Sequence, residues 1–176
     1  MSARRSVAPK WTLERFLAHA LAIEEEAALR YRELALQLEV HHNEPVSHLF
    51  TDLAAEEARH AERIRRLVGT RRLPVLKPWE YRWKEPESPE AAPYDAAHYR
   101  MTAHHALRMA LAAEQRAERF FAAVARQTSD RKLKALAKEF ATEELSHAAS
   151  VTAALEKTPA PPANWAADFD PPIAQD

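Results

Sequence analysis

Two Glu-x-x-His pairs stand at positions where a helix packed into a protein core should carry apolar side chains. The first pair is Glu57 with His60, and the second is Glu144 with His147. Residues three apart in a helix lie one turn from each other on a single face. At helical spacing, each pair interrupts a stripe that is otherwise apolar. The first stripe contains Val46, Phe50, Leu53, Glu57, His60, Ile64 and Leu67. The second contains Leu133, Ala137, Phe140, Glu144, His147, Val151 and Leu155.

Two further helical stripes are each interrupted by a single glutamate. In the first helix of the chain this residue is Glu24, and in the third it is Glu114. The segment from Glu24 to Tyr31 aligns with the segment from Glu114 to Phe121, and each is followed by a turn and a Glu-x-x-His helix. The chain is therefore an internal repeat of two helical hairpins.

The composition favours long, uninterrupted helices and one domain. The 176 residues include one glycine, and the twelve prolines fall mostly in the N-terminus, the middle and the tail. Such a distribution is hard to reconcile with a sheet built on glycine turns. The absence of cysteine excludes disulfides and thiolate-ligated zinc or iron–sulfur sites within this chain. We therefore expect an all-α fold.

Cap and turn residues predict where the four helices begin and end. Thr12 is a candidate N-cap for the first helix, and Asn43 with Pro45 marks the start of the second, which Gly69 should end. The predicted third helix begins near Asp95, and the fourth follows a turn at 128–130 and runs to about residue 157. We accordingly divide the chain into an N-terminal arm (1–11), a four-helix bundle (12–157) and a Pro/Ala-rich tail (158–176).

Residues 70–94 form an unusually long connection between the second and third helices. The segment lacks helical periodicity and is rich in proline. A loop of this length is uncommon within a compact domain, but it can run the full length of a helix of about 25 residues, or about 37 Å. We therefore predict a crossover that leaves the second and third helices parallel, with Trp79, Tyr81 and Trp83 attaching it to the bundle surface.

The hairpin geometry predicts that the four glutamates lie at one height. In an antiparallel hairpin, residues equidistant from the turn are level with each other. The midpoint between Glu24 and Glu57 falls at the first turn, and the midpoint between Glu114 and Glu144 falls at Ser129 in the second. Packing the hairpins face to face brings four carboxylates and two imidazoles into one small volume.

This arrangement is energetically plausible only with compensating positive charge. Each buried, unpaired carboxylate costs several kcal/mol, against a total domain stability of about 5–15 kcal/mol. No lysine or arginine occupies the four stripes at that height. Two divalent cations would neutralise the site, and a carboxylate and imidazole ligand set suits iron or manganese.

The Glu24 to Tyr31 run, its repeat from Glu114 and the two Glu-x-x-His pairs resemble the ferritin-like superfamily, and within it the rubrerythrin-type (erythrin) di-iron domain. The resemblance covers residues 12–157. It implies a ferritin-like four-helix bundle that holds two iron ions, with Glu57 and Glu144 as bridging ligands. The full ligand set that it implies is Glu24, Glu57, His60, Glu114, Glu144 and His147.

The chain departs from the family pattern at three points. Rubrerythrins carry a cysteine-ligated rubredoxin domain that is absent here, so the resemblance implies an external electron donor such as a rubredoxin. Many members carry a further glutamate one turn after the third-helix ligand. This chain has Ala117 at that position, which makes the six-ligand site more symmetric. Bacterioferritin has a haem-binding methionine directly after the second-helix glutamate. This chain has Ala58 at that position, so we expect no haem.

Three residues beside the predicted ligands have candidate supporting roles. Tyr31 lies two turns from Glu24 on the same stripe, and the resemblance suggests that it donates a hydrogen bond to a ligand or to bound oxygen. Alternatively, it packs in the core with its hydroxyl satisfied elsewhere. Glu56 and Glu143 could accept the free N–H of the opposite pair's histidine, or they could be solvated.

These features predict a di-iron oxidoreductase that reduces peroxide or dioxygen. The alternatives are a ferroxidase that serves iron storage and a non-catalytic, iron-binding scaffold bundle. With a net charge of −1, nothing suggests nucleic acid as a partner, and no segment is apolar enough to span a membrane. We expect a cytoplasmic protein that forms a homo-oligomer, with a dimer favoured.

Overall fold

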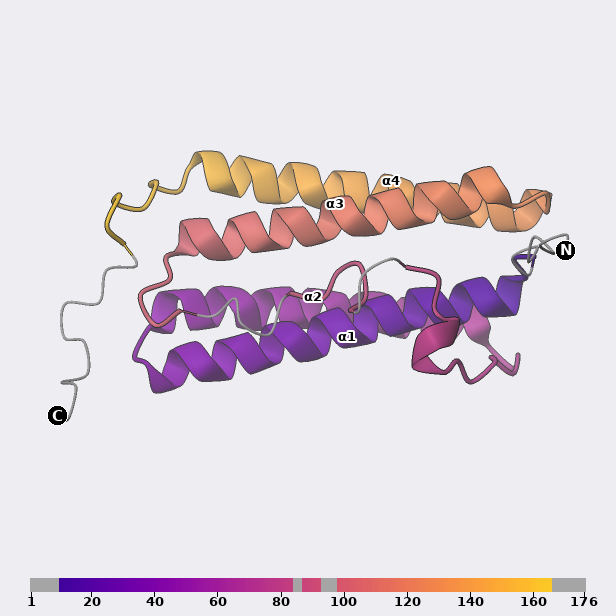
Figure 1. Ribbon diagram of the computed structural model, residues 1–176, viewed down its shortest axis with the longest axis horizontal. Helices are drawn as coiled ribbons and strands as arrows, with labels where there is room; N and C mark the ends of the chain where they lie inside the picture. Colours follow the sequence, from indigo (N-terminus) through magenta and orange to yellow (C-terminus); the bar gives the residue numbers. More distant parts are fainter. Residues whose placement is uncertain (1–9, 84–86, 93–97, 166–176) are drawn as a thin grey trace, which may run out of the picture.

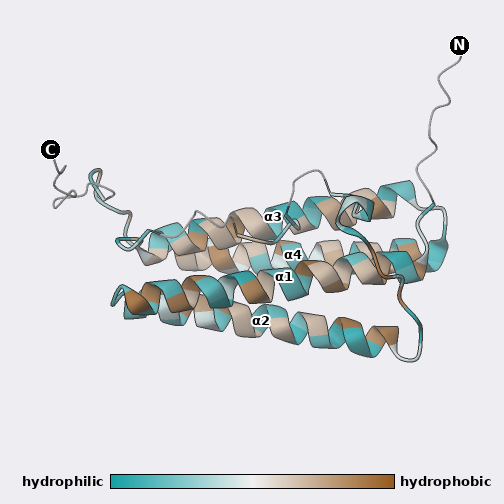
Figure 2. Ribbon diagram, turned by 60° about the horizontal axis from the view of Figure 1, so that its bottom comes forward, coloured by the Kyte–Doolittle hydropathy of each residue, from teal (hydrophilic) through white to brown (hydrophobic). Residues whose placement is uncertain are grey.

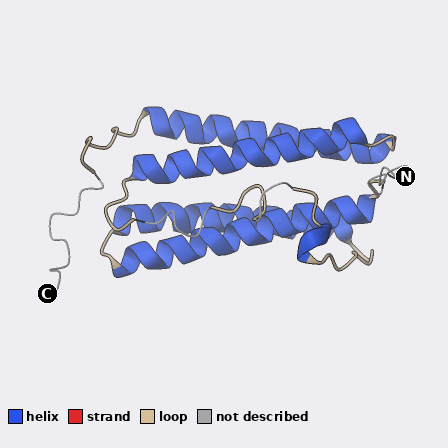
Figure 3. Ribbon diagram, in the orientation of Figure 1, coloured by secondary structure: helices blue, strands red, loops and turns tan. Residues whose placement is uncertain are grey.

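The computed structural model describes residues 10–83, 87–92 and 98–165 and is built from four long α-helices. A short 3₁₀-helix, η1 (Pro78–Glu80), lies in the connection between the second and third of them, and the described residues contain no strand (Figure 3). The prediction of an all-α, ferritin-like four-helix bundle is confirmed. The helices are α1 (Leu13–Val40), α2 (Glu44–Val68), α3 (Ala103–Gln127) and α4 (Arg131–Glu156).

The predicted cap residues stand at the observed helix ends. The hydroxyl of Thr12 accepts a hydrogen bond from the backbone N–H of Arg15 at 3.2 Å, so it caps α1. Gly69 ends α2 with a φ of 56°, a left-handed conformation that favours glycine. Asn43 is the N-cap residue of α2, but its side chain donates to the carbonyl of Met101 at 2.6 Å. This contact ties the first hairpin turn to the start of α3.

The helices pair as two antiparallel hairpins joined by a crossover. α1 packs most extensively on α2, and α3 on α4. In Figure 1, α2 and α3 run in the same direction, and the segment between them returns along the length of the bundle. The predicted parallel arrangement of the second and third helices is therefore confirmed.

The third helix begins later than predicted. Asp95 lies outside the described residues, and the described residues that follow, 98–102, are not helical. The helix starts at Ala103, where Thr102 and His105 form reciprocal capping contacts. A cap set by these contacts, rather than apolar periodicity, decides where α3 begins.

The aromatic residues of the crossover behave differently from one another. Tyr81 and Trp83 pack edge-on against the buried ring of His19 in α1, with ring centroids 5.3 Å and 5.7 Å from it. Trp79 is 78% exposed, and the ammonium group of Lys77 in the same segment lies over its ring. The prediction that Trp79 attaches the crossover to the bundle is therefore wrong, because the residue lies in η1 on its solvent side.

The apolar core is divided into two clusters, and each cluster takes side chains from all four helices. The first lies toward the α1–α2 turn and includes Leu34, Phe50, Leu107 and Val151. The second lies toward the α3–α4 turn. Its members include Phe16, Ile64, Phe121 and Phe140. In Figure 2, apolar and polar residues alternate along every helix, as expected for amphipathic helices that share one core.

Within the part of the chain that the structure describes, no helix combines the length and the apolar character that crossing a bilayer requires.

Candidate metal centre

The bundle brings the six predicted ligands together between the two apolar clusters. α1 contributes Glu24 and α3 contributes Glu114, while α2 and α4 each contribute a Glu-x-x-His pair. All four glutamates are at least 96% buried. The predicted layer of carboxylates and imidazoles is therefore present at mid-bundle, although the identity of the metal ligands stays a prediction.

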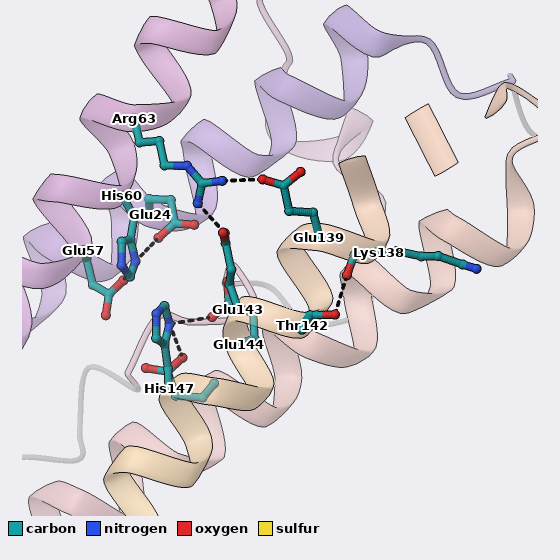
Figure 4. Close-up of polar contacts among 11 residues, drawn as sticks. Glu24, Glu57, His60, Arg63, Lys138, Glu139, Thr142, Glu143, Glu144 and His147 are labelled. Carbon is teal, nitrogen blue, oxygen red and sulfur yellow. Dashed lines mark hydrogen bonds and ion pairs between the residues drawn. The ribbon is translucent and has the colours of Figure 1, made fainter. Parts of the chain in front are cut away.

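The first hairpin forms one Glu/Glu/His triad. Nδ1 of His60 lies 3.2 Å from a carboxylate oxygen of Glu57 and 3.5 Å from one of Glu24. Figure 4 shows the His60 ring directed at these two carboxylates. The candidate ligand atoms of the three residues all lie within 4.8 Å of one another.

The second hairpin repeats the triad almost unchanged. Nδ1 of His147 lies 3.3 Å from a carboxylate oxygen of Glu144 and 3.5 Å from one of Glu114. The candidate ligand atoms of these three residues also lie within 4.8 Å of one another. The rings of His60 and His147 stack on each other. The sequence repeat thus becomes two facing triads with matching distances.

Burial and mutual charge strongly perturb the acids of the triads. Burial, together with the charges of Glu57 and Glu144, raises the pKa of Glu24 to about 8 against the opposing effect of His60. Burial likewise raises the pKa of Glu144 to about 7. Both values lie well above the usual range of a glutamate.

The two histidines are shifted in the direction that favours the imidazolium. Burial lowers the pKa of His60, but the carboxylates of Glu24 and Glu57 outweigh this effect and raise it to about 10. The neighbouring carboxylates of Glu114 and Glu144 raise the pKa of His147 to about 11. Without metal, the site thus neutralises part of its charge with protons that a cation would have to displace.

A fifth glutamate, which the sequence analysis missed, joins this layer from the crossover. Glu90 is 2% exposed, and its candidate ligand atom lies within 4.8 Å of those of Glu24 and Glu144. Burial raises its pKa well above the usual range, and the charges of Glu24 and Glu144 add to this shift. The buried layer therefore contains a fifth carboxyl group in addition to the six predicted residues. A signal was present in the unusual length of the crossover, but no periodicity singled out this residue.

Tyr31 lies in the core beside the carboxylates. It is 1% exposed, and its ring stacks on Phe50 with 5.8 Å between centroids. Burial raises its pKa well above the usual range, and the charges of Glu57, Glu114 and Glu90 raise it further. Its hydroxyl is therefore kept protonated at the edge of the cluster, while its predicted role in catalysis stays a prediction.

The two glutamates that precede the α2 and α4 ligands differ in their surroundings. Glu56 has a candidate ligand atom within 4.8 Å of those of both His60 and His147, as the predicted supporting role requires. Glu143 instead forms an ion pair with Arg63 of α2. For Glu143 the predicted contact with a histidine is therefore replaced by a bridge between α2 and α4 (Figure 4).

Arg63 stands at the rim of a small void that reaches the site. It also pairs with Glu139 at 2.6 Å and lies over the ring of Phe140. The void has a volume of about 10 Å³. Its lining residues are Glu24, His60, Arg63, Ile64, Phe140, Glu143, Glu144 and His147.

The unsatisfied atoms of the layer fit a group of metal cations. Both carboxylate oxygens of Glu90, and one each of Glu24 and Glu114, are buried and have no hydrogen-bond partner among the described residues, although the oxygens of Glu24 and Glu114 lie 3.5 Å from a histidine Nδ1. A native structure rarely leaves such atoms unpaired. Carboxylates with one imidazole per triad suit iron or manganese. The residues of the layer could therefore hold metal.

Comparison with known proteins agrees with this arrangement. The model of the Rubrerythrin family matches residues 15–155. The chain is similar to a crystal structure of an uncharacterized conserved protein from Magnetospirillum magnetotacticum MS-1, with 38% sequence identity and a TM-score of 0.68. The match covers 86% of this chain and 99% of that one. No curated protein matches the chain. On this match and on the four-helix bundle with its two Glu/Glu/His triads, the chain belongs to the rubrerythrin family.

Proposed function

We propose that this protein is a non-haem di-iron oxidoreductase that reduces hydrogen peroxide, with dioxygen as the less favoured oxidant. The observation that carries the proposal is the pair of facing Glu/Glu/His triads, whose buried carboxylate oxygens include atoms without a hydrogen-bond partner among the described residues. Membership of a family that typically binds iron supports iron over manganese. Two ions, one per triad, match the ligand set of di-iron bundles.

Each residue of the layer has a defined part in this proposal. Glu24, Glu57 and His60 would hold one ion, and Glu114, Glu144 and His147 would hold the other. Iron bound there would supply the electrons that reduce the oxidant. The hydroxyl of Tyr31, which its raised pKa keeps protonated, is available as a hydrogen-bond donor at the edge of the layer.

The surroundings of the site support a small oxidant. The void beside Glu24, His60 and Glu144 has a volume of about 10 Å³, which is close to the space that one water molecule needs. Hydrogen peroxide and dioxygen have two heavy atoms each, so either is far closer to this size than an organic substrate. The apolar clusters on both sides of the layer exclude bulk water from the carboxylates.

Sustained turnover would need a separate electron donor. The sequence contains no cysteine, so it cannot carry a rubredoxin-type iron site of its own. A separate rubredoxin is a donor of suitable chemistry. A single oxidation of the reduced protein needs no donor and therefore isolates the chemistry of this chain.

The test is anaerobic reconstitution with ferrous iron, followed by stopped-flow mixing with each oxidant at equal concentration. We expect about two iron ions per chain. Oxidation by peroxide should exceed oxidation by dioxygen by at least about tenfold, a difference in activation free energy of about 1.4 kcal/mol. Equal or reversed rates would favour a ferroxidase, as would iron mineral formed after aerobic loading. Fewer than about one iron per chain would contradict the proposed centre.

A further inference from the structure

The crossover inserts one tight turn into the bundle, and this turn carries Glu90. The backbone N–H of Ala91 donates to the carbonyl of Ser88 at 3.1 Å, which closes the turn. Ser88, Glu90, Ala91 and Ala92 are each at least 97% buried. The part of the crossover that passes mid-bundle is therefore packed as core and does not lie on the surface as an ordinary loop.

Both carboxylate oxygens of Glu90 lack a hydrogen-bond partner among the described residues. This distinguishes Glu90 from Glu24 and Glu114, in each of which only one buried oxygen lacks a hydrogen bond, and that oxygen lies 3.5 Å from a histidine Nδ1. A fully buried carboxylate without a donor is unfavourable unless it is neutralised. Its raised pKa reflects this burial and the charges of the neighbouring acids. No hydrogen bond from this side chain to a described residue helps to hold the crossover in place.

The neighbours of Glu90 come from both halves of the site. Its candidate ligand atom lies within 4.8 Å of those of Glu24 in α1 and Glu144 in α4. Glu24 belongs to one triad and Glu144 to the other, so Glu90 lies where the two triads meet. An ion held between these residues would satisfy the oxygens that now have no partner.

Arg116 of α3 fixes the backbone on either side of Glu90. Its Nε donates to the carbonyl of Pro89 at 2.7 Å, and its guanidinium also donates to the carbonyl of Ala91 at 3.2 Å. One side chain thus holds the residue before and the residue after the glutamate. This contact sets the height and the direction from which the turn enters the bundle.

We propose that Glu90 is a fifth carboxylate ligand of the binuclear metal centre, delivered by the crossover, and that Arg116 is the residue that positions it. This assignment rests on the proposed function, since it presupposes that the two triads hold metal. It makes the centre asymmetric, because the extra carboxylate has no counterpart in the other half of the repeat. One more negative charge also favours the higher oxidation state of the bound pair.

The test uses the full-length protein, anaerobic titration with cobalt(II) and the substitution Glu90→Gln. Cobalt(II) resists oxidation under these conditions, and its visible ligand-field bands gain intensity as the coordination number falls. We expect the wild type to bind about two ions per chain. Glu90→Gln should weaken the binding by at least about tenfold and intensify the bands. Glu87→Gln is the matched control, because Glu87 lies in the same segment with its side chain 30% exposed, and it should leave both readouts unchanged.

Thermal unfolding separates a ligand from a structural residue. Glu90→Gln should raise the melting temperature of the metal-free protein, because it removes an acid whose ionised form is buried without a partner. It should reduce the extra stability that cobalt confers on the wild type. A purely structural Glu90 would instead give a variant that is less stable with and without metal, and this result would overturn the assignment.

Two other results would also overturn it. If the wild type binds two ions and Glu90→Gln changes neither affinity nor spectrum, only the assignment of Glu90 fails and the proposed function stands. If the wild type binds a third ion that Glu90→Gln removes, Glu90 belongs to a separate site. A wild type that binds no cobalt, iron or manganese would refute the proposed function and this assignment together.

The role of Arg116 is tested by a double-mutant cycle. Arg116→Ala should weaken cobalt binding. Arg119 is an exposed arginine one turn further along α3, so Arg119→Ala is the control and should not weaken it. In the Glu90→Gln background, Arg116→Ala should cause no further loss, because both changes act through the same carboxylate. Additive losses would overturn the positioning role, and circular dichroism would verify that each variant keeps its helices.

Discussion

The imidazole rings of His60 and His147 lie face to face, with 4.6 Å between their centroids and 6° between their planes. Each ring comes from the second helix of its own hairpin, and each directs Nδ1 at the carboxylates of that hairpin. The contact therefore marks where the two halves of the repeat meet. Two stacked imidazolium rings would repel each other, so displacement of their protons by metal would relieve this repulsion.

Replacing a bridging candidate should separate metal binding from stability. Glu144→Gln should reduce the iron content of the reconstituted protein to about half or less, because Glu144 contacts both His147 and the Glu90 side of the layer. The same change should raise the melting temperature of the metal-free protein, since it removes a buried acid from a crowded cluster. Metal analysis and calorimetry measure the two effects.

Glu156→Gln is the control for this substitution, because Glu156 is exposed at the end of the same helix. It should change neither quantity. An unaltered iron content in Glu144→Gln would contradict the bridging role.

The stability of the metal-free protein should fall as the pH rises. Burial raises the pKa of Glu144 to about 7 and of Glu24 to about 8. The surrounding carboxylates raise the pKa of His60 to about 10 despite its burial. The folded state therefore holds protons that the unfolded chain releases at lower pH. The stabilisation that these protons provide is fully present below the unfolded-state pKa values, and it is lost as the pH rises through the folded-state pKa values.

Urea denaturation in the presence of a chelator measures this dependence. The free energy of unfolding should decrease between about pH 6 and pH 9, the range over which these groups differ most between the two states. Iron affinity should change in the opposite direction and increase with pH, because bound metal displaces the same protons. A free energy of unfolding that is constant or increasing across this range would contradict the shifted pKa values.

Removing the arginine at the rim of the void should accelerate the release of bound metal to solvent. Arg63 joins α2 to Glu139 and Glu143 of α4 beside the void. Because this pair of contacts is partly exposed, Arg63→Ala should cost no more than about 1 kcal/mol of stability. The rate at which a chelator removes metal should nevertheless rise several-fold.

Arg65→Ala is the matched control for this change, since Arg65 forms ion pairs with Glu25 and Glu62 without lining the void. Equal chelation rates for the two variants would show that the void is not the route to the centre.

The hydroxyl of Tyr31 can be tested without disturbing its packing. Tyr31→Phe keeps the ring contact with Phe50 and should leave iron content and melting temperature nearly unchanged. If the hydroxyl donates a hydrogen bond or a proton during reduction of the oxidant, the single-turnover rate should fall by at least about tenfold. Tyr99→Phe, at an exposed tyrosine, is the control. A rate equal to that of the wild type would assign Tyr31 to packing alone.

The features that follow from helical periodicity were predictable from the sequence. The spacing of Glu57 and His60, and the distance of each predicted ligand from its turn, depend on local geometry that repeats along a helix. The same reasoning brought Glu24 and Glu114 to the height of the two pairs, where the structure has them. Both hairpins and their carboxylate layer could therefore be derived before any tertiary contact was known.

The features that depend on single long-range contacts were not predictable. Glu90 reaches the site because Arg116, distant in sequence, binds the carbonyls of its two neighbours. The start of α3 is decided by contacts between Thr102 and His105, and Glu143 turns to Arg63 because that guanidinium is within reach. Such contacts do not produce a periodic pattern. These residues therefore could not be distinguished in the sequence from other residues of a loop or of a helix flank.

The division of the apolar core has a consequence for how the protein would acquire the proposed metal ions. Each of the two clusters draws side chains from all four helices, so both ends of the bundle can remain closed while the layer between them opens. Local opening of this kind requires less free energy than global unfolding. Backbone amides of the middle turns should therefore exchange hydrogen faster than those of the ends when metal is removed. Metal ions could then be loaded into an assembled bundle without unfolding either apolar cluster.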